Sequence, residues 1–356
     1  MNYIPNWNAV KERYMQTWAM ENHDRPLMHI TAREPRSGSV LPKAPDSVEG
    51  YWLDIDYVLK RQRYIFDNTA YAGEGYPLYC PNLGPDIFGA ILGANIKFTK
   101  DTSWATHIDT EWKDFQPVYD KQNKWLQTIL ELTHAAVEDS RGDYFVGITD
   151  IHSGMDALVS LKGPETVCMD IMDKPDDIEQ LPMKLFKVMQ AFYDDLYHIT
   201  RKYQQGTSNW MTAWHEKRWY VTSCDFISLI SPAQFDRFVL KELQAEASWF
   251  DASIFHLDGP QCIRHLDKIM AVDGINAIQW VPLPGEDVPE KWRDLLMKIQ
   301  AAGKGLHLHI RPEDIGRYAE FLKPEGVMMS ANVDSKAEAE ELLKHTEHAF
   351  YKKRFF

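Results

Sequence analysis

The sequence has few cysteines and no long hydrophobic run. The 356-residue chain contains four cysteines without CxxC spacing, at Cys80, Cys168, Cys224 and Cys262. Neither a disulfide framework nor a stand-alone zinc module is indicated. No apolar segment approaches the roughly 20 residues that a membrane-spanning helix needs, and the first residues lack the basic and apolar regions of a signal peptide. We expect a cytoplasmic protein with no membrane partner.

Positive charge is also scarce. Lys and Arg together number 39 against 52 Asp and Glu, which gives a net charge of -13. Nucleic-acid binding is not expected, because it requires a basic surface. We find no Gly-rich dinucleotide turn, phosphate loop, nucleophile elbow or HExxH motif, so the enzyme classes that carry these motifs are not indicated.

Apolar and aromatic residues are abundant. They make up 44% of the chain and include 12 Trp, 16 Tyr and 16 Phe, which is enough for a large core. After residue 250, predicted strands alternate with predicted helices. These strands cover residues 252–258, 275–280, 305–310 and 326–331. Earlier apolar segments predict strands at 27–32, 144–149 and 209–214, with 94–98 as a possible further strand and 219–222 as a possible hairpin partner of 209–214.

This alternation predicts a parallel sheet covered by helices. Roughly eight strand and helix units in one chain fit a (β/α)8 TIM barrel better than an open doubly wound sheet. We therefore expect an α/β fold with a helical N-terminal extension before residue 24 and long βα loops such as 69–93. A single domain over residues 1–356 is expected, because no linker divides the chain.

The main candidate site is on the predicted strand that ends at Gly259-Pro260. Side chains alternate along a strand, so His256 and Asp258 point to the same side. A histidine and a carboxylate so placed can both bind one divalent metal. Alternatively, Asp258 fixes the tautomer of His256 or caps the next helix. Without a metal, the pair would act as a general acid and base.

Other polar residues follow the remaining strands, at the end where TIM barrels carry their active sites. His309 is a candidate metal ligand, although a histidine bonded to a carbonyl is the ordinary alternative. Cys224 offers a thiolate to a soft metal, or is simply a small apolar side chain. Trp210, Trp214 and Trp280 either floor a pocket for a flat or quaternary-ammonium ligand or belong to the core. Further candidates at strand ends are Asp150, His152, Asp225 and Gln279.

Several stretches, in order along nearly the whole chain, resemble the uroporphyrinogen decarboxylase superfamily, most closely its corrinoid-linked methyltransferase branch. They are Asp24-Arg25-Pro26, Gly84-Pro-Asp-Ile-Phe-Gly-Ala-Ile-Leu-Gly93, Thr149-Asp-Ile-His-Ser-Gly-Met-Asp156, Leu161-Lys-Gly163, Ile230-Ser-Pro-Ala-Gln-Phe235, His256-Leu-Asp-Gly259, Ile278-Gln-Trp280 and Ala302-Gly-Lys304. The resemblance implies a (β/α)8 barrel with its pocket at the carboxyl ends of the strands.

The resemblance also implies a metal. Zinc methyltransferases of this superfamily hold zinc with a His-x-Cys pair and a distant Cys, and the zinc converts a thiol acceptor into a thiolate. In this chain His256 stands at the His position, Asp258 replaces the first Cys, and Ser330 replaces the distant one. A mixed set of His256 and Asp258 with His309 or Cys224 would hold zinc with less sulfur.

The function that these observations predict is methyl transfer between a corrinoid carrier protein and a small acceptor or donor, assisted by a metal. His256, Asp258 and Asp225 would be the catalytic residues. The substrate would contact Asp150, His152, Trp214, Gln279 and Trp280. A metal-free decarboxylase is an alternative, although the arginine-rich segment of that class is represented only by Arg33 and Arg36. A barrel that binds a small ligand or a partner without catalysis is a third possibility.

Overall fold

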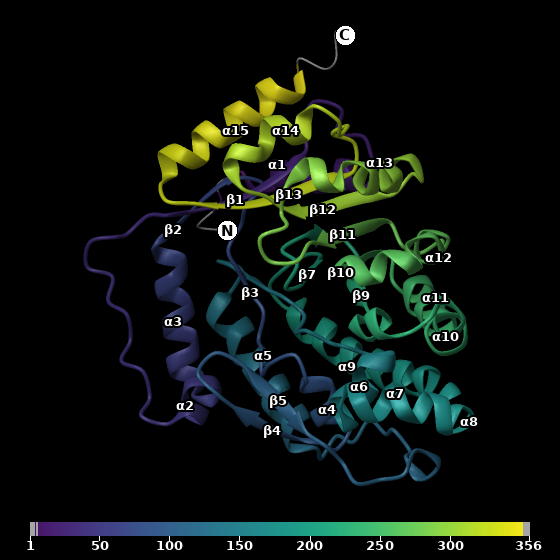
Figure 1. Cartoon of the computed structure of the whole chain (residues 1–356). Helices are drawn as coiled ribbons and strands as arrows, with labels where there is room; N and C mark the ends of the chain where they lie inside the picture. The colour runs from purple at the N-terminus through teal and green to yellow at the C-terminus, as the bar shows by residue number, and fades with distance from the viewer. Residues whose placement is uncertain (1–3, 5, 352–356) are drawn as a thin grey trace.

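The computed structural model describes Ile4 and residues 6–351, and its centre is a mainly parallel β-sheet (Figure 1). The main sheet has seven strands in the order β2-β1-β13-β12-β11-β10-β9. All neighbours in it are parallel except β1 and β2. The strands are β1 (Leu27–Arg33), β2 (Thr69–Gly73), β9 (Trp219–Ser223), β10 (Ala252–Asp258), β11 (Ala277–Val281), β12 (Gly305–His309) and β13 (Val327–Val333).

Six short strands form three separate pairs. The pairs are parallel β3 (Leu78–Tyr79) with β6 (Phe145–Val146), antiparallel β4 (Asn95–Phe98) with β5 (Ser103–Thr106), and antiparallel β7 (Thr207–Ser208) with β8 (Trp214–His215). A parallel bridge also joins Ile148 to Asn209. Within residues 6–351, the pairings do not close the main sheet into a ring.

Helices surround the strands, and α14 and α15 cover the region of β1, β12 and β13 (Figure 1). The α-helices are α1 (Trp7–Trp18), α2 (Val48–Leu53), α3 (Ile55–Asp67), α4 (Ile87–Ile91), α5 (Lys124–Ser140), α6 (Gly154–Lys162), α7 (Pro164–Asp173), α8 (Pro175–Glu179), α9 (Leu181–Thr200), α10 (Pro232–Phe238), α11 (Leu240–Trp249), α12 (Leu266–Met270), α13 (Arg293–Ala301), α14 (Ile315–Ala319) and α15 (Lys336–Tyr351). The 3-10 helices are η1 (Trp112–Asp114), η2 (Asp225–Leu229), η3 (Pro260–His265), η4 (Pro289–Trp292) and η5 (Pro312–Asp314).

The alternation predicted for the last hundred residues is confirmed. Strand β10 has the predicted bounds, and β11, β12 and β13 lie within a few residues of theirs. Ser231 and Gln234 form a capping box at the start of α10, which satisfies backbone N–H groups that have no partner within the helix.

Two strand assignments were wrong. Segment 95–98 pairs with β5 in a separate hairpin, not with the sheet. Segment 219–223 is a parallel strand of the main sheet beside β10 and is not the hairpin partner of 209–214. Residues 78–79, in the loop expected at 69–93, form a strand parallel to β6 that sequence patterning missed. Two-residue strands are too short to show periodicity.

On the face of the main sheet that carries Ile254, the residues at the amino ends of the strands are apolar. A cluster of buried residues there contains Leu27, Trp219, Ala252, Ile254, Ala277 and Met328. Val10 and Tyr14 of α1 belong to the same cluster, so the predicted N-terminal helix covers this end. Phe255 and Leu257, which alternate with Ile254 along β10, belong to a second and larger cluster. Strand alternation therefore gives β10 one face in each cluster.

No helix among the described residues is both long enough and apolar enough to cross a membrane.

A buried ion pair holds the start of β1. Arg25 donates to both carboxylate oxygens of Glu74, at 2.7 and 2.9 Å, and Glu74 also accepts the backbone N–H of Met28 at 2.8 Å. Arg25 and Glu74 are 8% and 5% exposed, so neither charge is compensated by water. Arg25 therefore has a structural role at the start of β1.

We expect Glu74→Ala to lower the free energy of unfolding by about 3 kcal/mol, because it leaves the buried Arg25 guanidinium with only the Pro26 carbonyl and the exposed Glu347, 3.6 Å away, as partners. Urea denaturation measures this difference. The matched control is Lys60→Ala, which removes an exposed ion pair with Asp56 and should cost about 0.5 kcal/mol or less. Equal losses in the two variants would contradict the assignment of Glu74 as a structural anchor.

Candidate functional site

Toward the carboxyl ends of the strands, polar side chains follow the apolar ones on the same face of the main sheet. His256 is opposite Ser223 of β9 and Gln279 of β11 in the strand register. Gln279 is in turn opposite His307 of β12. The same register that aligns the apolar residues therefore aligns a row of polar ones, and the structure brings His256, Gln279 and His307 together.

These three residues form a hydrogen-bonded chain with defined tautomers. Nδ1 of His256 is bonded to Oε1 of Gln279 at 2.5 Å, and Nε2 of Gln279 to Nδ1 of His307 at 3.2 Å. Because an amide oxygen only accepts and an amide nitrogen only donates, His256 carries its proton on Nδ1. Nε2 of His256 is then free to bind a metal or a proton. Burial lowers the pKa of His307 to about 3, so His307 is neutral.

The predicted pair converges with Asp225. One ligand atom from each of Asp225, His256 and Asp258 lies within 4.8 Å of the others. The tautomer of His256 is fixed by Gln279 and not by Asp258, and η3 has no side-chain cap at its start. The two alternatives for Asp258, tautomer fixation and helix capping, are therefore not what the structure shows.

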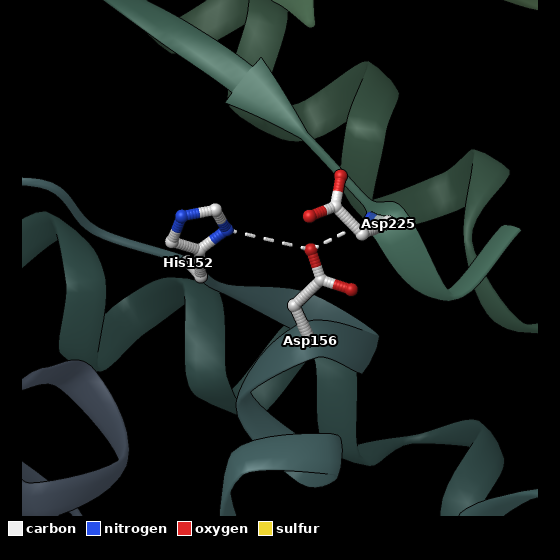
Figure 2. Close-up of side chains that lie close together, drawn as sticks. All are labelled: His152, Asp156 and Asp225. Carbon is white, nitrogen blue, oxygen red and sulfur yellow. Dashed lines mark hydrogen bonds and ion pairs between the residues drawn. The ribbon is translucent and has the colours of Figure 1, made fainter. Parts of the chain in front are cut away.

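A second convergent group contains Asp225 together with His152 and Asp156, again within 4.8 Å (Figure 2). Nε2 of His152 is 3.0 Å from Oδ2 of Asp150, and its Nδ1 is 3.5 Å from Oδ2 of Asp156. Burial disfavours the charged imidazole, but the hydrogen bonds and charges of the two carboxylates outweigh this effect and raise the pKa of His152 well above its ordinary value.

Asp156 positions the loop after β9. Its two carboxylate oxygens accept the backbone N–H groups of Asp225 and Phe226, at 2.8 and 3.0 Å. Partial removal from water and the nearby Asp156 raise the pKa of Asp225, while His256 and His152 oppose that rise. Sequence reasoning gave Asp156 no role. The available signal was its position four residues after His152, in the first turn of α6.

Two cavities are lined by residues of these clusters, and neither lining includes His256. The first, of about 250 Å³, is lined by His152, Asp156 and Asp225 together with Pro85, Asp86, Val159, Pro164, Phe226 and Leu229. The second, of about 290 Å³, is lined by His29, Thr31, Trp210, Met211, Thr212, Gln279, His307, His309, Ser330, Ala331 and Asn332. The first is acidic and the second contains no carboxylate, and neither of these linings includes Lys or Arg.

Trp210 contacts both the second cavity and His256. It lines the second cavity, and its ring makes an edge contact with the ring of His256 at 5.3 Å between centroids. The expectation that a tryptophan at a strand end would wall a pocket is therefore met by Trp210.

The pocket roles predicted for Trp214 and Trp280 need correction. Trp214 is buried in the apolar cluster at the amino end, where its ring contacts Trp7 and Tyr14 of α1. Trp280 follows the inward-facing Gln279, so it points to the opposite side and packs on Trp292 at 4.7 Å between ring centroids. Neither tryptophan lines either of the two cavities.

The structure separates the other two predicted metal ligands from both groups. His309 lines the second cavity, and its Nδ1 is 3.1 Å from Oγ of Ser330. Cys224 is buried next to Asp225, and burial followed by the charge of Asp156 raises the pKa of its thiol well above the ordinary value. A thiol that resists ionisation is a poor ligand. Neither residue is part of a convergent group within the described chain.

Comparison with known proteins gives matches among solved structures but none by sequence family. No family model matches the chain, and no curated protein matches it in sequence. A solved structure described as a methyltransferase from Methanosarcina mazei is similar over 96% of this chain and 99% of its own, with a TM-score of 0.59 and 14% sequence identity. The two proteins therefore share a fold over nearly their whole lengths.

Replacing Gln279 by Met should break the hydrogen-bonded chain. His256 and His307 would each lose a partner, so the free energy of unfolding should fall by about 1–3 kcal/mol. Nitrogen-15 NMR of the imidazoles should show that His256 no longer carries its proton mainly on Nδ1. Gln300→Met is the matched control, since Gln300 bonds the backbone of Lys323 at an exposed position and water can replace it. An unchanged tautomer in Gln279→Met would contradict the assignment.

Glu242 makes stability depend on pH. It lies buried on α11, and burial raises its pKa to about 8 from 4.5. A raised folded-state pKa stabilises the fold below pH 4.5, and this contribution is lost as the pH rises through about 8. In metal-free protein, Glu242→Gln should therefore lose less stability over this interval than the wild type. Urea midpoints at the two ends test this, with exposed Glu340→Gln as the control, which should behave like the wild type.

Proposed function

We propose that this chain is a methyltransferase that moves a methyl group between a corrinoid carrier protein and a small acceptor or donor, with the help of a bound divalent cation. The observation that carries the proposal is the convergence of Asp225, His256 and Asp258 at the carboxyl ends of the strands. The fold shared with a methyltransferase supports the same conclusion. The proposal includes a (β/α)8 barrel in a single domain, in which β3, β6 and β7 continue the main sheet.

The donor set fits a cation. Two carboxylates and one imidazole suit zinc and other divalent first-row metals, and no thiolate is required. Nε2 of His256 is available because Nδ1 is bonded to Gln279, which is the outer hydrogen bond that metal-binding histidines usually make. A cation bound there would lower the pKa of a thiol or hydroxyl acceptor and so make it a better nucleophile.

The chain's own residues would then position the reactants. The first cavity adjoins Asp225, and its apolar side, formed by Val159, Phe226 and Leu229, would exclude water from a small substrate. The absence of Lys and Arg from both linings favours uncharged or cationic substrates over anionic ones. The decarboxylase alternative is not favoured for the same reason, since a substrate with several carboxylates would find no Lys or Arg in either lining.

A cytoplasmic location is part of the proposal. All four cysteines are free, as is usual in a reducing compartment.

Methyl transfer can be tested with methylcobalamin in place of the carrier-bound corrinoid. Three thiols of similar size should be compared as acceptors: uncharged 2-mercaptoethanol, cationic cysteamine and anionic 3-mercaptopropionate. We expect the wild type to remove the methyl group, seen as a change in the cobalamin spectrum, with the anionic thiol reacting slowest. His256→Ala should lose bound metal and about 100-fold or more of the rate, because a lost ligand should cost at least as much as a lost outer partner.

The matched control is His134→Ala, at an exposed histidine on α5, which should retain both metal and rate. An unchanged methylcobalamin spectrum with every acceptor would contradict the methyltransferase proposal. Metal-free wild-type protein that still transferred methyl groups would leave His256 and Asp258 as an acid and base pair. Binding of the thiols without transfer would favour a non-catalytic ligand-binding protein.

A further inference from the structure

Asp225 belongs to both convergent groups, and the proposed function uses only one of them. The group used above adds His256 and Asp258 of β10, and the other adds His152 and Asp156 from the start of α6. A carboxylate has two oxygens and can bind two cations at once, one through each oxygen. In Figure 2 the carboxylate of Asp156 lies between the ring of His152 and Asp225, and dashed lines join it to both.

In both His152 and His256, one ring nitrogen is bonded to a residue that is not a member of the convergent group. Nε2 of His152 is bonded to Asp150, which leaves Nδ1 toward Asp156 at 3.5 Å, with Oγ of Ser223 3.4 Å from the same nitrogen. Nδ1 of His256 is bonded to Gln279, which leaves Nε2 free. Histidines that bind metals in proteins almost always donate their other N–H group to a carboxylate, carbonyl or water, and this bond fixes the tautomer and the ring orientation. Two histidines, one in each of the groups that share Asp225, have such a bond.

The charge around Asp225 is strongly negative. Asp150, Asp156, Asp225 and Asp258 lie together with two histidines, and the first cavity contains neither Lys nor Arg in its lining. In the metal-free protein the imidazole of His152 is the positive partner of Asp150 and Asp156. A cation that replaced the proton on Nδ1 of His152 would take over that role beside Asp156 and Asp225.

Asp156 can bind a cation without releasing the loop that it holds. Its Oδ2 accepts the N–H of Asp225, and its Oδ1 accepts the N–H of Phe226. Each carboxylate oxygen has two lone pairs, so one remains on Oδ1. The second lone pair of Oδ2 faces Nδ1 of His152 at 3.5 Å, where a cation would take the place of the imidazole proton. The cavity of about 250 Å³ is lined by all three members of this group, so a cation there would be open to a small ligand.

We propose that His152, Asp156 and Asp225 form a second divalent-cation site, and that Asp225 bridges it to the cation at His256 and Asp258. The inference rests on the metal site of the proposed function but not on methyl transfer. A cation at His152 would face the first cavity and would hold or activate an oxygen, nitrogen or sulfur atom of the molecule bound there.

Manganese provides the direct test. The full chain is stripped with a chelator, incubated with excess Mn²⁺ and desalted, and the bound metal is counted by plasma emission spectrometry. We expect two Mn²⁺ per chain in the wild type, one in His152→Ala and one in His256→Ala. Asp225→Asn should lose at least one and should lose the magnetic coupling between the two ions. Electron paramagnetic resonance should show that coupling in the wild type and not in either histidine variant.

His309→Ala is the matched control, because it removes a histidine from the second cavity, outside both groups, and should keep two coupled ions. One Mn²⁺ per wild-type chain, unchanged in His152→Ala, would overturn the inference. So would two ions without coupling, since Asp225 would not then bridge them. Circular dichroism of each variant separates loss of a ligand from loss of the fold.

The outcome is distinct from that of the methyl-transfer assay. Two coupled ions in a protein that leaves methylcobalamin intact would support the bridged centre and contradict the proposed function. Methyl transfer by a protein with one bound ion would support the proposed function and contradict the bridged centre.

Discussion

The candidate site depends on one carboxylate that holds a loop from a distant part of the chain. Asp156 belongs to the first turn of α6, and its two oxygens accept the backbone N–H groups of Asp225 and Phe226, sixty-nine and seventy residues further on. Hydrogen bonds to an ionised acceptor are short and about twice as strong as neutral ones. They determine where β9 turns into η2 and therefore where the carboxylate of Asp225 lies. Since Asp225 is shared by both donor groups, each group depends on this contact.

One face of the main sheet is apolar at the amino ends of its strands and polar toward their carboxyl ends. The apolar cluster at the amino ends, covered by α1, supplies the hydrophobic stabilisation, and the row of polar residues above it supplies the chemistry. Polar groups are tolerated there because they are paired: Gln279 satisfies His256 on one side and His307 on the other. The two cavities then differ in charge, since one is lined by carboxylates and the other by neutral imidazole, amide and hydroxyl groups. This difference separates a place for cations from a place for uncharged molecules.

Much of the C-terminal half could be predicted from sequence because its signals are local. Ile254, Phe255 and Leu257, followed by Gly259-Pro260, specify β10 and the shared face of His256 and Asp258 without reference to the rest of the chain. The short strands β3 and β7 could not be predicted, since partners far apart in sequence create them, whereas β6 lies within the strand predicted at 144–149. Asp156 was missed for a similar reason: an aspartate in a first helical turn is ordinary, and its role appears only once the chain around Asp225 is in place. The error at Trp280 was avoidable, because alternation with Gln279 already places it on the other face.

Gly154 has a consequence for recognising related chains. Its φ is +58°, and a Cβ atom there would lie 2.9 Å from Oε2 of the buried Glu242. A larger residue at 154 would thus strain the backbone and displace the first turn of α6, which carries Asp156. Chains that share this architecture but little overall identity should therefore preserve the spacing Asp-x-His-x-Gly-x-Asp. That short signature offers a way to find distant members of the group where whole-length similarity has faded.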